Sequence, residues 1–292
     1  MIYTLKNDHF TAKVDSLGAQ LISLKGQDGF ERIWVGDAKY WTGQAPVLFP
    51  MVGALRGGKT EIDGAVYEMG QHGFARRREF TKIKQNAPDT VSLTLLSDEE
   101  TRKMYPFDFS FTVTYTLTET GYSTAFTVQN KGAQSLPFAV GGHPGFNIPA
   151  GEEAAFEDYT IVFEKTESQR CPAIVMGQGL IDPENSAYTL EGTEIPLTHS
   201  LFYKDALVFE NLNSQSVKVV NKATGHGVEM NFAGFPLFGI WSAANDGPYV
   251  CLEPWTGCAT RTTEGDKFTE KHGMIHLPAG GESTHSFEVK IL

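Results

Sequence analysis

The sequence predicts an all-β protein, folded as one antiparallel β-sandwich that spans residues 1–292. Short segments in which apolar and polar residues alternate recur along the whole chain, as expected for strands with one buried face. The 30 glycines and 14 prolines can supply the many turns that such strands need. No long segment has helical periodicity, and no linker, repeat or charge block divides the chain into separate domains.

The individual strands follow from this alternation. The clearest pair is 107–117 and 122–128, which Thr120-Gly121 joins. Asp63-Gly64 interrupts the alternating stretch 60–69, and this dipeptide is a strong signal for a two-residue hairpin turn. The other expected strands, in chain order, are 10–14, 21–24, 91–95, 160–163, 206–209, 217–220, 228–232, 237–241, 249–252 and 286–291.

Composition excludes several classes of function. The net charge of −11 argues against a broad nucleic-acid-binding surface. No apolar run approaches the roughly 20 residues that span a membrane, and the first eight residues lack the apolar region of a signal peptide, so we expect a cytoplasmic protein. The three cysteines form no CxxC pair, which predicts buried, reduced thiols rather than a disulfide framework or structural zinc.

The segment 136–149 has the most unusual composition. It sets His143 among glycines and prolines, between apolar residues. Glycine lets a backbone approach a ligand closely, and imidazole is the side chain that titrates nearest neutral pH. Such a loop on a rigid β scaffold can present a histidine to a substrate. A turn with a hydrogen-bonded structural histidine is the alternative.

Polar residues in two segments flank the Asp63-Gly64 hairpin. Arg56 precedes the hairpin, and Gln71, His72 and Arg76 follow it, so the hairpin can return both segments to one end of a sheet. Together they form a donor-rich set that suits sugar hydroxyl groups or a phosphate. The two arginines after Arg76 are more typical of solvated charges.

Two further segments carry acidic residues. Asp205 precedes an expected strand, where a turn residue is the simpler interpretation. Glu253 closes the apolar strand at 249–252, and Trp255 follows two positions later. A carboxylate beside an indole ring is typical of a sugar site. The sequence has no phosphate-binding loop, dinucleotide fingerprint or nucleophile elbow, and a glycosidase with two carboxylates remains an alternative.

The order of these segments resembles the aldose 1-epimerases, the galactose mutarotase family. The resemblance covers nearly the whole chain and rests on Arg56, Gln71-His72-Gly73-Phe74-Ala75-Arg76, Gly142-His143-Pro144-Gly145-Phe146, Asp205 and Glu253-Pro254-Trp255. It implies a β-supersandwich fold and no cofactor. It also implies Glu253 as general base and His143 as general acid, with Arg56, His72 and Asp205 as sugar ligands. No cluster of possible ligands in the sequence has metal-like spacing, so we also expect no metal.

The resemblance leaves the sugar open. Free-galactose enzymes usually carry Asn-Arg where this chain has Leu55-Arg56, whereas the His72–Arg76 segment is similar to the hexose-6-phosphate branch, in which positions 71 and 76 contact the ligand. The acidic chain and its form of the His143 loop favour a free aldohexose such as galactose or glucose. The alternatives are a hexose-6-phosphate 1-epimerase and a non-catalytic sugar-binding protein. We expect a monomer or homodimer with a small-molecule sugar as its partner, and neither nucleic acid nor membrane.

Anomer exchange requires one proton to leave the C1 hydroxyl and another to reach the ring oxygen. We expect an ionised Glu253 to accept the first and a protonated His143 to donate the second. A nearby carboxylate would raise the pKa of the histidine and keep it charged.

Overall fold

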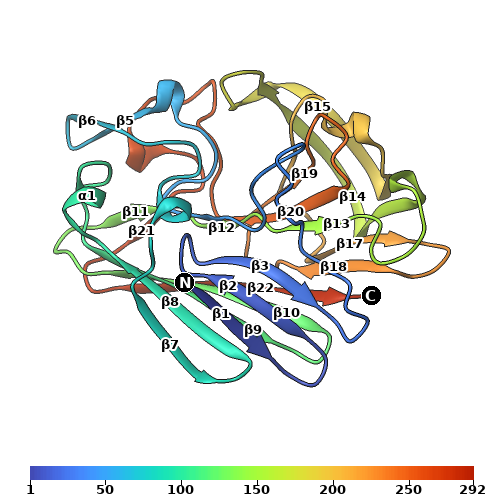
Figure 1. Cartoon of the computed structure of the whole chain (residues 1–292). Helices are drawn as coiled ribbons and strands as arrows, with labels where there is room; N and C mark the ends of the chain where they lie inside the picture. Colours follow the sequence, from blue (N-terminus) through green and yellow to red (C-terminus); the bar gives the residue numbers. More distant parts are fainter.

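Two large antiparallel sheets pack against each other in the computed structural model, which describes residues 1–292 (Figure 1). The larger sheet has nine strands, in the order β15 (Leu180–Pro196), β14 (Tyr159–Val175), β17 (Ser216–Asn221), β18 (Gly227–Asn231), β22 (Glu282–Ile291), β10 (Gly121–Asn130), β9 (Phe109–Leu117), β8 (Thr90–Leu96) and β7 (Lys82–Ala87). The second sheet has six strands, in the order β16 (Leu207–Glu210), β19 (Leu237–Trp241), β20 (Tyr249–Trp255), β12 (Gly141–Gly142) and β4 (Val47–Leu48), with β13 (Gly145–Asn147) also paired to β20.

Three small sheets complete the architecture. They contain β1 (Ile2–Lys6), β2 (Thr11–Asp15) and β3 (Gln20–Lys25); β5 (Lys59–Ile62) and β6 (Ala65–Glu68); and β11 (Leu136–Phe138) and β21 (Ile275–Leu277). The only α-helix is the single turn α1 (Glu99–Arg102), and the 3-10 turns are η1 (Arg56–Gly58), η2 (Ala75–Arg77), η3 (Phe156–Asp158), η4 (His199–Phe202) and η5 (Phe268–Glu270). None of these helices has the length and apolar character needed to cross a membrane.

The alternation of apolar residues predicts most strands correctly. Strand β19 has the expected bounds, and β9 and β10 pair in register from Tyr122 with Leu117 to Asn130 with Phe109. The expected hairpin turn joins β5 to β6, with positive φ angles of 51° at Asp63 and 79° at Gly64. The all-β antiparallel sandwich is confirmed.

The long hairpin of β14 and β15 extends well beyond the predicted strand 160–163. Its outer part is rich in polar and charged residues and includes Pro172 and Pro183, so it lacks the alternation that marks a half-buried strand. The two strands support each other through backbone pairing, with register shifts on both sides of Pro172. Backbone pairing supports this hairpin together with a few buried side chains, such as Cys171 and Leu190.

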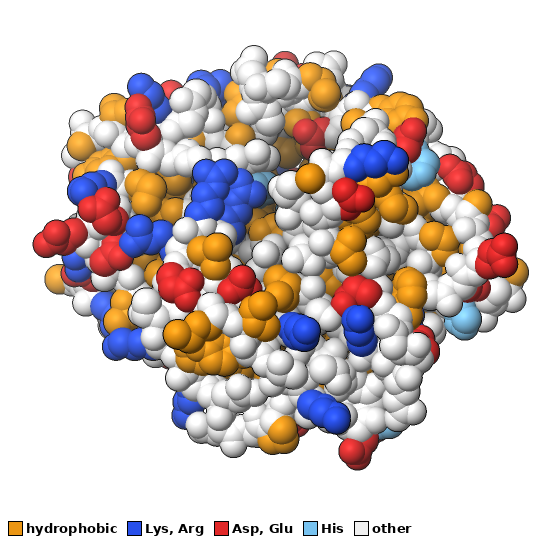
Figure 2. Space-filling model, in the orientation of Figure 1, with side chains coloured by type: hydrophobic (Ala, Val, Ile, Leu, Met, Phe, Trp, Pro, Cys, Tyr) orange, Lys and Arg blue, Asp and Glu red, His pale blue; other side chains and the backbone are white.

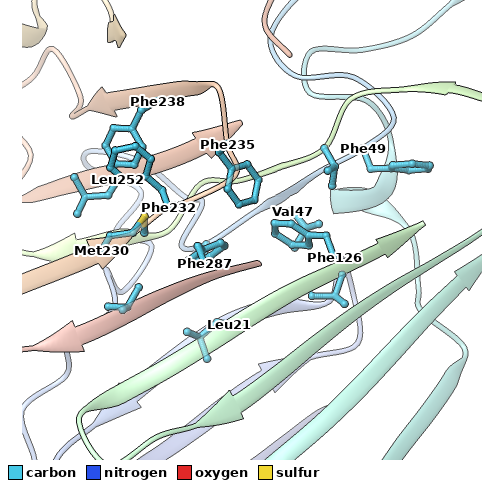
Figure 3. Close-up of a cluster of buried hydrophobic side chains, with 14 of the residues drawn as sticks. Leu21, Val47, Phe49, Phe126, Met230, Phe232, Phe235, Phe238, Leu252 and Phe287 are labelled. Carbon is cyan, nitrogen blue, oxygen red and sulfur yellow. The ribbon is translucent and has the colours of Figure 1, made fainter. Parts of the chain in front are cut away.

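The core between the two large sheets is aromatic and continuous. Its main cluster contains 61 buried residues drawn from both sheets. Figure 3 shows Phe126 of β10 and Phe287 of β22 within this cluster, together with Val47 of β4 and Leu252 of β20. The centroids of the Phe126 and Phe287 rings lie 5.9 Å apart. All three cysteines are buried and free, as predicted.

We expect Phe126→Ala to lower the free energy of unfolding by about 3–5 kcal/mol, because the truncation leaves a cavity between the sheets. Urea denaturation measures this change. Gln129→Ala is the matched control, since Gln129 lies on the same strand but bonds to Glu282 at an exposed position, and its effect should stay within about 0.5 kcal/mol. Equal losses in the two variants would contradict this account of the core.

Candidate active site

Strand β20 carries the candidate catalytic carboxylate in the middle of the smaller sheet. Side chains alternate between the two faces of a strand, so Glu253 lies on the same face as Cys251 and Trp255. Val250 and Leu252 point the other way and belong to the main core between the sheets. The strand continues to Trp255, so Glu253 lies within it rather than at its end. The Glu253 side chain is only 1% exposed.

The pairing register of β20 places His143 opposite this carboxylate. Gly141 pairs with Trp255 and Gly145 pairs with Cys251, so the residue midway between the two glycines faces Glu253. The His143 backbone N–H donates to the carbonyl of Pro46, which fixes the loop from its other side. As a result, His143 Nε2 lies 3.3 Å from Glu253 Oε2.

Burial shifts the proton affinities of this pair in opposite directions. It lowers the pKa of His143 to about 3, and the positive charge of Arg76 acts in the same direction. Burial also raises the pKa of Glu253 well above its usual range, and the nearby negative charge of Asp205 adds to that rise. The expectation that the carboxylate raises the histidine pKa is therefore wrong for the sugar-free protein, because loss of solvent determines the direction of the shift.

His72 presents an N–H group to the same site. Its Nδ1 accepts a hydrogen bond of 3.0 Å from the backbone N–H of Gly53, so the ring proton lies on Nε2. Its own backbone N–H donates to the Gly53 carbonyl, which holds the residue at a positive φ of 64°. The His72 and His143 rings meet edge to face at 5.7 Å, and burial, with further contributions from His143 and Arg76, lowers the pKa of His72 well below its usual range.

Arg76 brings a positive charge to the pair without a counter-ion. No salt bridge or side-chain hydrogen bond engages its guanidinium, and its Nε is buried without a partner. By contrast, Arg78 pairs with Asp98, and Arg77 is exposed. Figure 2 shows Lys or Arg side chains bordering a hollow in this face of the molecule, with a histidine visible inside it.

Asp205 and Trp255 flank Glu253. Asp205 precedes β16 with a φ of 85°, and its carboxylate accepts the N–H of Ala206. The Trp255 indole lies across Gly141 and Gly239, where an added Cβ would come within 2.6 Å of its ring. The Trp255 N–H opposes the rise in the pKa of Glu253, but its geometry falls short of a hydrogen bond.

Two predicted sugar ligands, Arg56 and Gln71, make no hydrogen bond or salt bridge to the pair. The Arg56 Nε lies 3.0 Å from Asp266, and its guanidinium also donates to the carbonyls of Arg261 and Glu264. Gln71 is exposed and makes no side-chain hydrogen bond. In this structure Arg56 therefore anchors the loop at 261–266.

Two tryptophans that the sequence did not single out enclose His143. The Trp41 ring stacks on the imidazole, with centroids 5.0 Å apart and planes inclined by 28°, and Trp241 meets it edge-on at 5.6 Å. Tyr249 in turn stacks on Trp41. The available signal was the rarity of tryptophan: the chain has only four, and Trp255 lies beside Glu253 as well.

Cys251 also joins the site, although its position in the sequence gave no indication of this. Its Sγ, a ring nitrogen of His143 and a carboxylate oxygen of Glu253 lie within 4.8 Å of one another. We expected no metal ligands because no segment had metal-like spacing. The register of β20 instead assembles these donor atoms from segments more than 100 residues apart.

Several known proteins are similar to this chain in sequence or in fold. The protein LacX encoded on the chromosome of Lactococcus lactis subsp. lactis is 34% identical over 304 residues, which cover 100% of both chains. The galactose mutarotase related enzyme from Lactobacillus acidophilus has 32% identity and a TM-score of 0.94, covering 100% of this chain and 97% of that chain. A galactose mutarotase-like protein from Lactobacillus casei has 29% identity and a TM-score of 0.91, with full coverage of both.

The family model for aldose 1-epimerase matches residues 1–287, nearly the whole of the sandwich and every residue of the site described above. This chain therefore belongs to the aldose 1-epimerase family.

Proposed function

We propose that this protein is a cofactor-independent aldose 1-epimerase that interconverts the α and β anomers of a free aldohexose such as galactose or glucose. The observation that carries the proposal is the buried pair of His143 and Glu253, with 3.3 Å between Nε2 and Oε2. Opening a pyranose ring moves one proton from O1 and one to O5, and both oxygens are bonded to C1. Two proton-transfer groups side by side suit this requirement.

The chemistry needs one proton on the pair. During ring opening the base accepts the O1 proton, the acid protonates O5, and the C1–O5 bond breaks to give the open aldehyde. Rotation about C1–C2 and closure on the other face return both protons. Each group therefore gives and accepts a proton within one turnover, so the pair must be neither fully protonated nor fully deprotonated.

Burial in the sugar-free site favours this proton on Glu253 and a neutral His143. The roles implied by the family, Glu253 as base and His143 as acid, require the proton to reach His143 when the sugar binds. The 3.3 Å separation allows direct transfer, and sugar hydroxyl groups can stabilise the carboxylate once it is ionised.

The surrounding residues suit a polyhydroxylated ring. In this proposal the Nε2–H of His72 donates to a sugar oxygen and Asp205 accepts from a hydroxyl group. Trp41 and Trp241 provide apolar ring faces beside the imidazole. Fixing the ring while C1 stays free to rotate would raise the rate through orientation.

A hexose-6-phosphate is the second candidate substrate, and Arg76 is the observation that favours it. An arginine without a counter-ion beside the catalytic pair can bind a phosphate through paired charge-assisted hydrogen bonds. The free sugar remains our proposal because no second arginine joins Arg76 at the site. Its neighbour Arg78 is engaged by Asp98, and Arg77 is exposed.

The first prediction concerns the protonation of His143. Because burial lowers its pKa to about 3, its imidazole should stay neutral as the pH falls from 8 to about 5, whereas an unperturbed histidine with a pKa near 6.5 becomes charged in that range. Imidazole 15N NMR of the sugar-free protein measures this, with His143→Gln assigning the signal. A His143 signal that titrates near pH 6.5 would show that burial does not control its charge.

Glu253→Gln and His143→Gln should each reduce kcat for anomer exchange by about 10²–10⁴-fold, because each keeps the side-chain size but removes a proton-transfer group. Polarimetry or NMR exchange spectroscopy gives the rates, and circular dichroism checks the fold. His285→Gln serves as the control, since His285 bonds to Ser283 on β22 outside the site, and it should retain the wild-type rate. A folded variant of either pair member with wild-type activity would refute the assignment.

A comparison of kcat/KM for galactose, glucose and glucose 6-phosphate tests the substrate. We expect the free hexoses to be preferred and Arg76→Ala to affect all three alike. Arg77→Ala, which changes the exposed neighbour, controls for the loss of one positive charge. A preference for the phosphate of about a hundredfold, equal to about 2.7 kcal/mol, that disappears only in Arg76→Ala would establish the second candidate.

A further inference from the structure

We propose that His143, Cys251 and Glu253 form a binding site for Zn²⁺ or a similar divalent cation, and that an ion bound there inhibits the enzyme. The ion would be an inhibitor and not a cofactor, because the proposed anomer exchange needs no metal. The binding of the ion is independent of the proposed function, whereas its inhibitory effect rests on that function.

The distances between the donor atoms are close to those of a zinc site. A tetrahedral Zn²⁺ ion with bonds of about 2.0–2.3 Å holds its donor atoms roughly 3.3–3.6 Å apart. His143 Nε2 and Glu253 Oε2 already lie 3.3 Å apart, and the full set of three donor atoms lies within 4.8 Å. Small side-chain movements therefore suffice to place all three around one ion.

The donor atoms are also chemically suited and free. Imidazole nitrogen, thiolate sulfur and carboxylate oxygen are the three ligand types that Zn²⁺ takes in proteins. No hydrogen bond of standard geometry engages the side chain of Cys251 or the ring nitrogens of His143, and His143 Nδ1 is buried without a partner. When the ion binds, the Cys251 thiol and the Glu253 carboxyl release any protons that they hold to solvent.

The backbone holds two of the ligands rigidly. Cys251 and Glu253 lie two residues apart on the same face of β20, a strand paired on both sides within the sheet. His143 comes from the neighbouring loop, which the bonds from Gly145 and His143 to the segment 44–46 fix in place. Three protein ligands leave a fourth position for water, the arrangement of zinc sites that remain open to small molecules.

The effect of such an ion on the reaction follows from its ligands. Zn²⁺ occupies the lone pairs on His143 Nε2 and Glu253 through which the pair would exchange protons with the sugar. An enzyme that carries the ion thus has neither acid nor base available at C1. We expect the chelator-treated protein to keep full activity and added Zn²⁺ to inhibit it, with a chelator restoring the rate.

Cobalt binding tests the site without reference to activity. Co²⁺ replaces Zn²⁺ in such sites, and a thiolate ligand gives the ion an intense near-ultraviolet charge-transfer band. The chelator-treated wild-type protein should develop this band on titration with Co²⁺, and Zn²⁺ should abolish it. Absence of the band in the wild-type protein would overturn the proposal whatever the variants do.

Cys251→Ala is the decisive variant, with Cys251→Ser as a second if the first is unstable. Both should fold and lose the cobalt band, and Zn²⁺ should inhibit each variant about tenfold or more weakly, measured against that variant's own metal-free rate. Cys171→Ala is the matched control, because Cys171 is equally buried but lies on β14, and it should behave as the wild type. Undiminished zinc sensitivity in the Cys251 variants would refute the proposal.

The outcomes also separate this inference from the proposed function. A cobalt band that depends on Cys251 in a protein without epimerase activity would uphold the metal site and refute the proposed function. An active epimerase that develops no cobalt band would uphold the proposed function and refute the metal site.

Discussion

The register between β20 and the segment 141–147 is the constraint on which the site depends. Two backbone pairings, Gly141 with Trp255 and Gly145 with Cys251, determine that His143 faces Glu253. A slip of one residue would turn Glu253 toward the main core and Leu252 toward the site. The packing that fixes the core thus also fixes the distance between the two proton-transfer groups.

Exclusion of water gives this geometry its chemical character. Glu253 is almost completely buried, and the one basic group within salt-bridge distance of it is the His143 ring, which burial keeps neutral. Arg76 is likewise left without an anion, although a carboxylate lies in the same region. The protein therefore holds an unpaired arginine and two buried proton-transfer groups around a small volume without forming an ion pair, which is the state expected of a site that is complete only when a polar ligand enters.

The sequence was sufficient to predict the strands whose residues alternate between apolar and polar in step with their buried and exposed faces. Alternating segments such as β9, β10 and β19 bury one face, so their pattern is visible without a fold. The outer part of the hairpin β14–β15 buries only separate side chains such as Cys171 and Leu190, so no alternation marks it, and backbone pairing supplies much of its support.

The site divides in a similar way. His143 and Glu253 were identifiable from their unusual neighbours, and the structure places His72, Arg76 and Asp205 near them. The ion pair between Arg56 and Asp266 joins residues 210 positions apart, so no local sequence pattern could predict it. The same holds for Cys251, whose proximity to His143 exists only through the sheet. The direction of the pKa shift at His143 depends on burial, which the sequence does not specify.

The place of β22 in the larger sheet has a consequence for how the chain acquires its structure during translation. This strand lies between β18 and β10, so the sheet is not continuous until residues 282–291 have been synthesised. Until then β10 has one unpaired edge, and the aromatic face that includes Phe126 lacks Phe287. Contacts of such long sequence separation form slowly, because the loop between them must close first. The nascent chain is therefore most prone to intermolecular strand pairing just before its last strand is added.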